Sequence, residues 1–207
     1  MKRELIAHND PKSPVSEVYR TLRTNIQFMN TNRKLKTLLI TSTLPGEGKS
    51  WVSSNLAVTF AQAGKKVILV DADMRKGRQY SIFGVSPKPG ISNYLSGIDE
   101  NENENENEKN ISKYIQETEI ENLYVMSAGN IPPNPSELLI SPKMVQLVEK
   151  LKNISDIVII DGTPSELVTD SMILARLVDS TVIVAEYGGT KKDNLKRVVN
   201  SIKNVGG

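Results

Sequence analysis

LLITSTLPGEGKS, residues 38–50, is the stretch of this chain that decides its fold class. It opens on a short apolar run that is typical of a buried strand, and a helical pattern follows from Lys49 to Ala63. Gly46 and Gly48 lie between the two, where glycine lets the backbone wrap closely and direct its N–H groups at phosphate oxygens. A glycine-rich turn between a strand and a helix is typical of a phosphate-binding loop in an α/β protein.

The predicted loop carries the side chains that a nucleoside triphosphate needs. Lys49 is expected to reach the β- and γ-phosphates of ATP, and the Ser50 hydroxyl is expected to bind Mg²⁺. The nucleotide-binding set is predicted to be Pro45, Gly46, Glu47, Gly48, Lys49, Ser50 and Trp51. Trp51 is expected to pack or to shield rather than to stack on the base. The usual motif has glycine where this chain has Thr43, so the alternative interpretation is a glycine-rich turn with an incidental Lys-Ser pair.

Composition excludes several other kinds of site. The net charge is +2 and no block of Lys and Arg stands out, so a nucleic-acid partner is not expected. The chain has no cysteine and one histidine, His8, which excludes a disulfide framework and a zinc site built from cysteines or a histidine cluster. No apolar run approaches the ~20 residues that span a bilayer, and the N-terminus lacks an apolar signal core. We expect a cytoplasmic protein that reaches a membrane only through a partner.

The rest of the chain alternates strand and helix. Strands are expected at 38–40, 67–70, 124–126, 157–160 and 181–185, and helices at 15–30, 49–63, 171–177 and 191–203, with two short helices between the turn at 132–135 and residue 153. The strands are continuous apolar runs, which is typical of a parallel sheet covered on both faces. We expect one P-loop domain over 1–207, a three-layer, doubly wound, mostly parallel sheet with helices on both faces. Residues 1–14 are expected to form a polar arm, and the Asn/Glu repeat at 99–110 a solvated loop.

Two acidic motifs lie where predicted strands end. Asp71 and Asp73 are two residues apart, so in an extended segment they point the same way, and Asp161 ends another strand. Ligands of such sheets bind at the carboxyl ends of the strands. Mg²⁺ prefers hard oxygen ligands and keeps several waters, so Ser50 plus one or two of these carboxylates is expected to bind the metal, and Ser50, Asp73 and Asp161 are the predicted set. A remaining carboxylate can accept a proton from a nucleophile. The alternative for each aspartate is a helix cap or a turn former.

Together these motifs resemble the bacterial tyrosine kinases of capsule and exopolysaccharide synthesis. The resemblance covers about 13–207 and is carried by residues 42–50, 70–76, 132–139 and 159–164. It implies transfer of phosphate from Mg-ATP to protein tyrosine, with Lys49, Asp71 and Asp73 as catalytic residues. Asp71 is the expected proton acceptor and Asp73 is expected to support the metal shell or to orient Asp71, while the exchanged assignment of these two roles stays open. It also implies a membrane-anchored activator whose cytosolic tail binds the chain, and hence a peripheral location at the inner face of the cell membrane.

A charged triplet on the first long helix extends the resemblance. Glu17, Arg20 and Arg23 are three residues apart, which places them towards one side of the helix. In the family this helix mediates self-association, so the resemblance implies a homo-oligomer with these residues at the interface. The alternative is a solvated charged face with a Glu17–Arg20 pair.

The chain also departs from the family pattern. It has Thr163-Pro164 where the family has two prolines, and its six tyrosines are scattered rather than gathered in a tail. Two other functions therefore stay open. One is an ATP-hydrolysing switch like the partitioning and division-site ATPases, although those have a lysine early in the loop and this chain has none between Ser42 and Leu44. The other is a nucleotide-binding, non-catalytic regulator of polysaccharide assembly.

Overall fold

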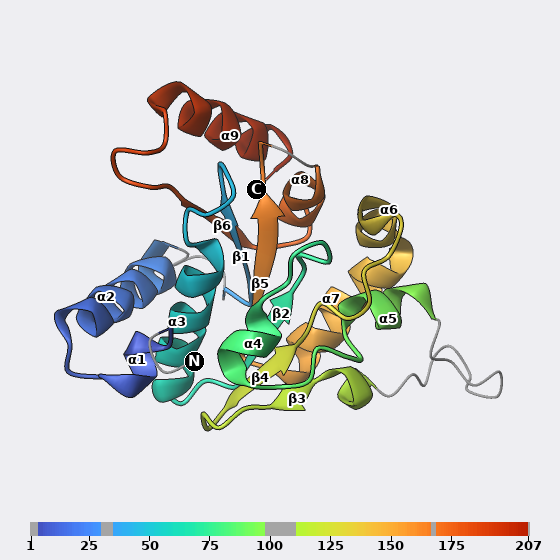
Figure 1. Ribbon diagram of the computed structural model, residues 1–207, viewed down its shortest axis with the longest axis horizontal. Helices are drawn as coiled ribbons and strands as arrows, with labels where there is room; N and C mark the ends of the chain where they lie inside the picture. Colours follow the sequence, from blue (N-terminus) through green and yellow to red (C-terminus); the bar gives the residue numbers. More distant parts are fainter. Residues whose placement is uncertain (1–3, 30–34, 98–110, 167–168, 207) are drawn as a thin grey trace.

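A six-stranded sheet forms the centre of the computed structural model, which describes residues 4–29, 35–97, 111–166 and 169–206 (Figure 1). The strands lie in the order β3-β4-β2-β5-β1-β6. Their bounds are β1 Thr37–Ser42, β2 Val67–Asp71, β3 Gln116–Glu117, β4 Leu123–Met126, β5 Ile157–Pro164 and β6 Ser180–Val184. Only the pairing of β3 with β4 is antiparallel. The predicted mostly parallel sheet is confirmed.

Helices cover both faces of the sheet. One face carries α1 (Ile6–Asn9), α2 (Pro14–Met29), α3 (Lys49–Gln62) and α4 (Gln79–Phe83). The other carries α5 (Ile91–Ser96), α6 (Pro135–Ile140), α7 (Pro142–Ile154), α8 (Asp170–Ala175) and α9 (Lys192–Asn204), with a short 3₁₀ helix at Ile111–Tyr114. The three-layer arrangement is therefore confirmed. In the part of the chain that the structure describes, no helix is long and apolar enough to cross a membrane.

The central strands β1, β2 and β5 carry continuous apolar runs because they are buried on both of their faces. In β1, Leu38 and Ile40 pack into the cluster beneath α3, whereas Leu39 packs into the opposite cluster with α7 and α8. None of these three side chains has any exposed surface. Alternate side chains of a strand point to opposite faces, so a strand covered on both sides needs no polar positions.

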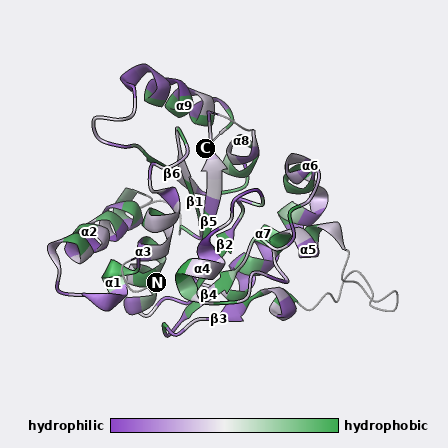
Figure 2. Ribbon diagram, viewed as in Figure 1, coloured by the Kyte–Doolittle hydropathy of each residue, from purple (hydrophilic) through white to green (hydrophobic). Residues whose placement is uncertain are grey.

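Helix α3 is held from two sides, by the sheet and by α2 (Figure 1). Every residue from Ser53 to Ala61 is buried. The outer helices α2 and α9 alternate between hydrophilic and hydrophobic residues along their length (Figure 2), as helices with one exposed face do. Burial all round fixes the position of α3, and its first two residues are Lys49 and Ser50.

Within the described residues, five short elements lie outside the sequence predictions. They are α1, α4, α5, the 3₁₀ helix and β3, each of two to six residues, too short to show a periodic pattern. The segment 4–14, expected as an arm, contains α1, and the backbone N–H of Ala7 donates to Asn55 Oδ1 at 2.9 Å. This part of the segment is thus packed onto α3. The loop predicted at 99–110 lies outside the described residues.

Candidate functional site

The loop between β1 and α3 has the backbone that its glycines predict. Gly46 and Gly48 have φ angles of 89° and 88°, in the left-handed region that glycine adopts without strain. A Cβ atom added to either would meet nothing within 4 Å. Glycine is therefore required here by backbone conformation and not by crowding.

Thr43, at the position where the usual motif has glycine, is held by Glu47. The Thr43 hydroxyl donates to the Glu47 carboxylate at 2.6 Å, and the Leu44 N–H donates to it at 2.9 Å. The Thr190 hydroxyl, from the segment after β6, donates to the same carboxylate. Burial acts to raise the pKa of Glu47, but these hydrogen bonds outweigh it and lower the pKa. The ionised carboxylate of Glu47 thus holds the two ends of the loop together through these hydrogen bonds.

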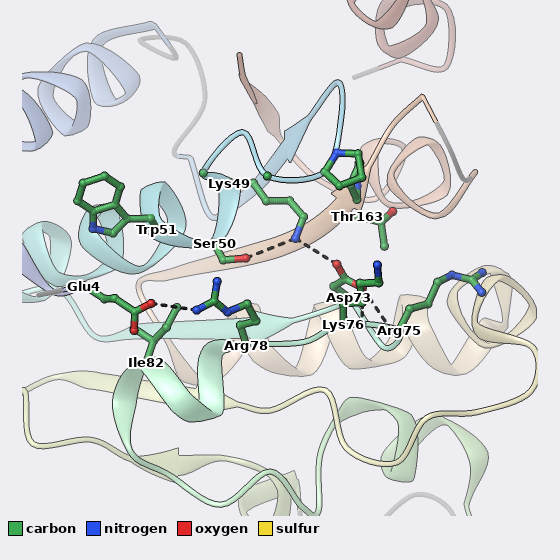
Figure 3. Close-up of a pocket in the computed structure, with 14 residues that line it drawn as sticks. Glu4, Lys49, Ser50, Trp51, Asp73, Arg75, Lys76, Arg78, Ile82 and Thr163 are labelled. Atoms are coloured by element: carbon green, nitrogen blue, oxygen red, sulfur yellow. Dashed lines mark hydrogen bonds and ion pairs between the residues drawn. The ribbon is translucent and has the colours of Figure 1, made fainter. Parts of the chain in front are cut away.

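Lys49 extends from the start of α3 towards the ends of β2 and β5 (Figure 3). Its Nζ atom lies 3.1 Å from Asp73 Oδ2, 4.0 Å from Asp161 Oδ1 and 3.4 Å from Ser50 Oγ. Burial acts to lower the pKa of Lys49, but the negative charges of Asp161 and Asp73 outweigh it and raise the pKa. The lysine is therefore a buried, charged group surrounded by the predicted metal ligands.

The three predicted carboxylates meet at the floor of this site. Asp71 lies directly opposite Asp161 in the β2–β5 pairing, and neither has exposed surface. Burial, together with the nearby Asp161 charge, raises the pKa of Asp71 to about 8. Burial likewise raises the pKa of Asp161. The register of two neighbouring strands thus creates a pair of crowded carboxylates.

Asp71 and Asp73 have different surroundings, contrary to what an extended segment would give, because β2 ends at Asp71. Asp71 accepts the backbone N–H of Gln79 at 2.9 Å and of Asp73 at 3.3 Å. Asp73 accepts the backbone N–H of Lys76 at 2.9 Å and lines the pocket beside Lys49. Asp71 is not among the residues that line this pocket.

The pocket has a volume of about 310 Å³ and opens directly beside the loop (Figure 3). Beyond the loop it is lined by Glu4, Trp51, Asp73, Arg75, Lys76, Arg78, Ile82, Thr163 and Pro164. Trp51 is 46% exposed, so its ring forms part of the rim rather than of the core. Arg75 is held by Asp170, whose Oδ2 lies 3.4 Å from Arg75 Nε. Cationic side chains thus line the pocket beside the loop, and both arginines are held in ion pairs.

The charged triplet of α2 does not act as one surface. Arg20 Nη1 donates to Glu17 Oε2 at 2.8 Å within the helix. Arg23 instead turns inward, and its Nη1 donates to the backbone oxygen of Thr59 in α3 at 2.5 Å. The side chain of Glu17 is 69% exposed and that of Arg20 is 29% exposed. Arg20 also donates to the backbone oxygen of Pro11, and Arg23 ties α2 to α3.

Two residues near the carboxylates were missed by sequence reasoning. Gln79 is fully buried and contacts both Asp71 and Asp161. Gly77 has no room for a side chain, since an added Cβ would lie 2.6 Å from Ala128 Cβ and 2.8 Å from Asp71 Oδ2. Neither belongs to a periodic pattern, so only their position after the Asp71–Asp73 motif could have pointed to them.

Comparison with known proteins gives the family. A model described as AAA domain matches residues 35–206. CapB of Staphylococcus aureus is 40% identical over 203 residues, which cover 98% of this chain and 85% of CapB. The tyrosine-protein kinase YwqD of Bacillus subtilis strain 168 is 39% identical over 98% of this chain and 81% of its own length.

Comparison with solved structures indicates the same family. The kinase domain of the Escherichia coli tyrosine kinase ETK matches with a TM-score of 0.89 and 34% identity, over 98% of this chain and 75% of that domain's chain. The chain belongs to the nucleotide-binding P-loop family of bacterial tyrosine-protein kinases.

Proposed function

We propose that this chain transfers the γ-phosphate of Mg-ATP to a protein tyrosine hydroxyl and thereby regulates capsule or exopolysaccharide synthesis. The observation that carries the proposal is the position of Lys49 between the phosphate loop, Asp73 and Asp161. Phosphoryl transfer requires positioning of the phosphates, neutralisation of their charge and an oriented nucleophile. The loop and Lys49 would position the phosphates and neutralise their charge, and a carboxylate would orient the nucleophile.

The site fits a magnesium ion. Asp161 Oδ1 is buried and has no hydrogen-bond partner among the described residues, although it lies 4.0 Å from Lys49 Nζ. Mg²⁺ usually binds through one or two carboxylates together with phosphates and water. Ser50 and Asp161 would hold the ion, and its charge would offset that of the β- and γ-phosphate oxygens.

Asp73 is the carboxylate best placed to accept the tyrosine proton. The resemblance implies Asp71 for this role, but Asp71 is fully buried and accepts two backbone N–H groups. Asp73 lines the pocket, and its Oδ2 contacts Lys49. When bound phosphates replace Asp73 as the partner of Lys49, Asp73 Oδ2 would face the hydroxyl group of the entering tyrosine. We therefore propose Asp73 as the proton acceptor, with Asp71 fixing the backbone on which Asp73 is carried.

We further propose two protein partners besides the tyrosine substrate. One is a second copy of the chain, supported by the exposed side chains of Val18 and Phe28, 65% and 70% exposed, on the same helix as Glu17 and Arg20. The other is a membrane-anchored activator, supported by the resemblance to the family, which would place the chain at the inner face of the cell membrane. Equal kinase rates with and without the activator's cytosolic tail would contradict the second partner.

ATP labelled on its γ-phosphate tests the proposed reaction. Label recovered on protein tyrosine supports the kinase. Label recovered only as free phosphate would replace it by the ATP-hydrolysing switch, and nucleotide binding without either product would leave a non-catalytic regulator. The Lys49→Met variant is the control: it should give little labelled product if the label is transferred at this site.

A further inference from the structure

A single buried amide, that of Gln79, connects the three elements that build the site. Gln79 is the first residue of α4 and has no exposed surface. Its backbone N–H donates to Asp71 Oδ2 at the end of β2, at 2.9 Å. Its side-chain Nε2 donates to Asp161 Oδ2 in β5 at 2.7 Å, and lies 3.2 Å from the backbone oxygen of Ser50 at the start of α3.

The orientation of the amide follows from its partners. A carboxylate oxygen and a backbone oxygen can only accept hydrogen bonds, so the NH₂ end of the Gln79 side chain faces Asp161 and Ser50. The Oε1 end lies 2.9 Å from the Ser54 hydroxyl, which can donate to it. Each end of the buried amide therefore meets a group of the matching kind, and rotation by half a turn would set two oxygens of the site against Oε1.

This contact decides how the Asp161 carboxylate is turned. With Oδ2 bound to Gln79, the other oxygen, Oδ1, is left on the side of Lys49, 4.0 Å from its Nζ atom, buried and without a hydrogen-bond partner among the described residues. A buried carboxylate oxygen without a partner is costly. Its presence beside the phosphate loop indicates an oxygen kept available for a cation.

We propose that Gln79 is a positioning residue that holds Asp161 with Oδ1 directed at the metal and phosphate side of the pocket, while its backbone holds Asp71. The inference rests on the proposed function, because it assigns Asp161 to magnesium. Gln79 acts through Asp161, since its side chain does not line the pocket. Residues that orient a metal ligand typically change metal affinity by about 10–100-fold when they are replaced.

The test measures the affinity for ADP by calorimetry, with and without Mg²⁺, in wild type and in Gln79→Met, which replaces the amide by an apolar chain of similar size. The gain in ADP affinity on adding Mg²⁺ should fall by about 10-fold or more in the variant. The ADP affinity without Mg²⁺ should stay close to that of wild type, because the loop and Lys49 are unchanged.

Asn55 supplies a matched control. It is also a fully buried amide near the site, on α3, but its partners are backbone groups: Nδ2 donates to Glu4 O at 2.8 Å and to Trp51 O at 3.0 Å, and Oδ1 accepts from Ala7 N at 2.9 Å. Asn55→Leu should lower the melting temperature, as Gln79→Met should, but leave the Mg²⁺ gain unchanged. If Gln79 had only a structural role, Gln79→Met would lower the melting temperature but leave the Mg²⁺ gain unchanged, as Asn55→Leu should.

The outcomes separate this inference from the proposed function. If Mg²⁺ does not raise the ADP affinity of wild type, the proposed magnesium site is wrong. If wild type shows the gain and Gln79→Met keeps it, the positioning role is wrong while the kinase proposal stands. Should Gln79→Met fail to fold, Gln79→Asn, which keeps an amide but shortens its reach to Asp161, gives the same reading: a full Mg²⁺ gain overturns the role, and a reduced one supports it.

Discussion

The ammonium group of Lys49 lies 3.1 Å from the carboxylate of Asp73, in a pocket where both are almost fully buried. A lysine held in this way is charged and close to the loop that is expected to bind phosphates. Nucleotide binding would exchange one anionic partner of Lys49 for another. The charge of the site is therefore fixed before the substrate arrives.

Lys49→Met should lower ATP affinity by roughly 10–100-fold, since a hydrogen bond to a charged group contributes about 1.5–3 kcal/mol. Calorimetric titration with Mg-ATP measures the change. Lys192→Met, at the exposed first residue of α9, removes the same charge away from the loop and should bind as wild type does. Equal affinities for the two variants would contradict the assignment of Lys49 to the phosphates.

Asp73→Asn should slow phosphoryl transfer at saturating ATP by about 10²–10⁴-fold, the usual contribution of a general base. ATP affinity should be kept or raised, because Lys49 loses a competing carboxylate. Asp71→Asn should retain more of the transfer rate, since Asp71 lies behind the pocket and its raised pKa already favours the neutral form at pH 7. Single-turnover measurements decide, and the opposite order of the two variants would return the role to Asp71.

Glu17→Ala combined with Arg20→Ala should weaken self-association and its dependence on salt, because exposed charges set the orientation of an interface and are screened by ions. Light scattering at low and high ionic strength gives the mass. Arg23→Ala should instead destabilise the fold by roughly 1–3 kcal/mol through the lost hydrogen bond to Thr59 O. An unchanged mass for the Glu17/Arg20 variant would remove this face from the interface.

Asp179 should contribute to stability only above acidic pH. Burial acts to raise the pKa of Asp179, but hydrogen bonds from Lys36 N, Thr37 N and the Thr37 hydroxyl outweigh it and lower the pKa. A carboxyl group whose pKa is lower in the folded state stabilises the fold above its unfolded pKa of about 3.9, and that contribution is lost as the pH falls through the folded value.

Denaturant unfolding between pH 3 and pH 7 therefore tests Asp179→Asn. The variant should be less stable than wild type at pH 7, and the difference should shrink towards pH 3. Glu121→Gln, at an exposed position outside any helix, is the control for loss of a surface charge. A difference that stays constant over this range would show that the carboxylate is not the source of the stabilisation.

Local patterns in the sequence were enough for the fold class and for the phosphate loop. Continuous apolar runs predict strands buried on both faces, and the turn around Gly46 and Gly48 needs residues that accept a positive φ. These signals depend on neighbours within a few positions of the chain. Elements without such a pattern, α4 and β3 among them, escaped prediction because they are too short to repeat it.

Contacts between distant residues were decided only by the tertiary structure. The register of β2 against β5 sets Asp71 beside Asp161, and Gln79 reaches Asp161 across 82 residues of chain. The same holds for Arg23, whose side chain turns inward because Thr59 O lies within its reach. The sequence pattern predicted that the charged groups lie at the carboxyl ends of the strands. Packing decided which of them face the pocket, because burial and hydrogen-bond partners depend on elements that are distant in the sequence.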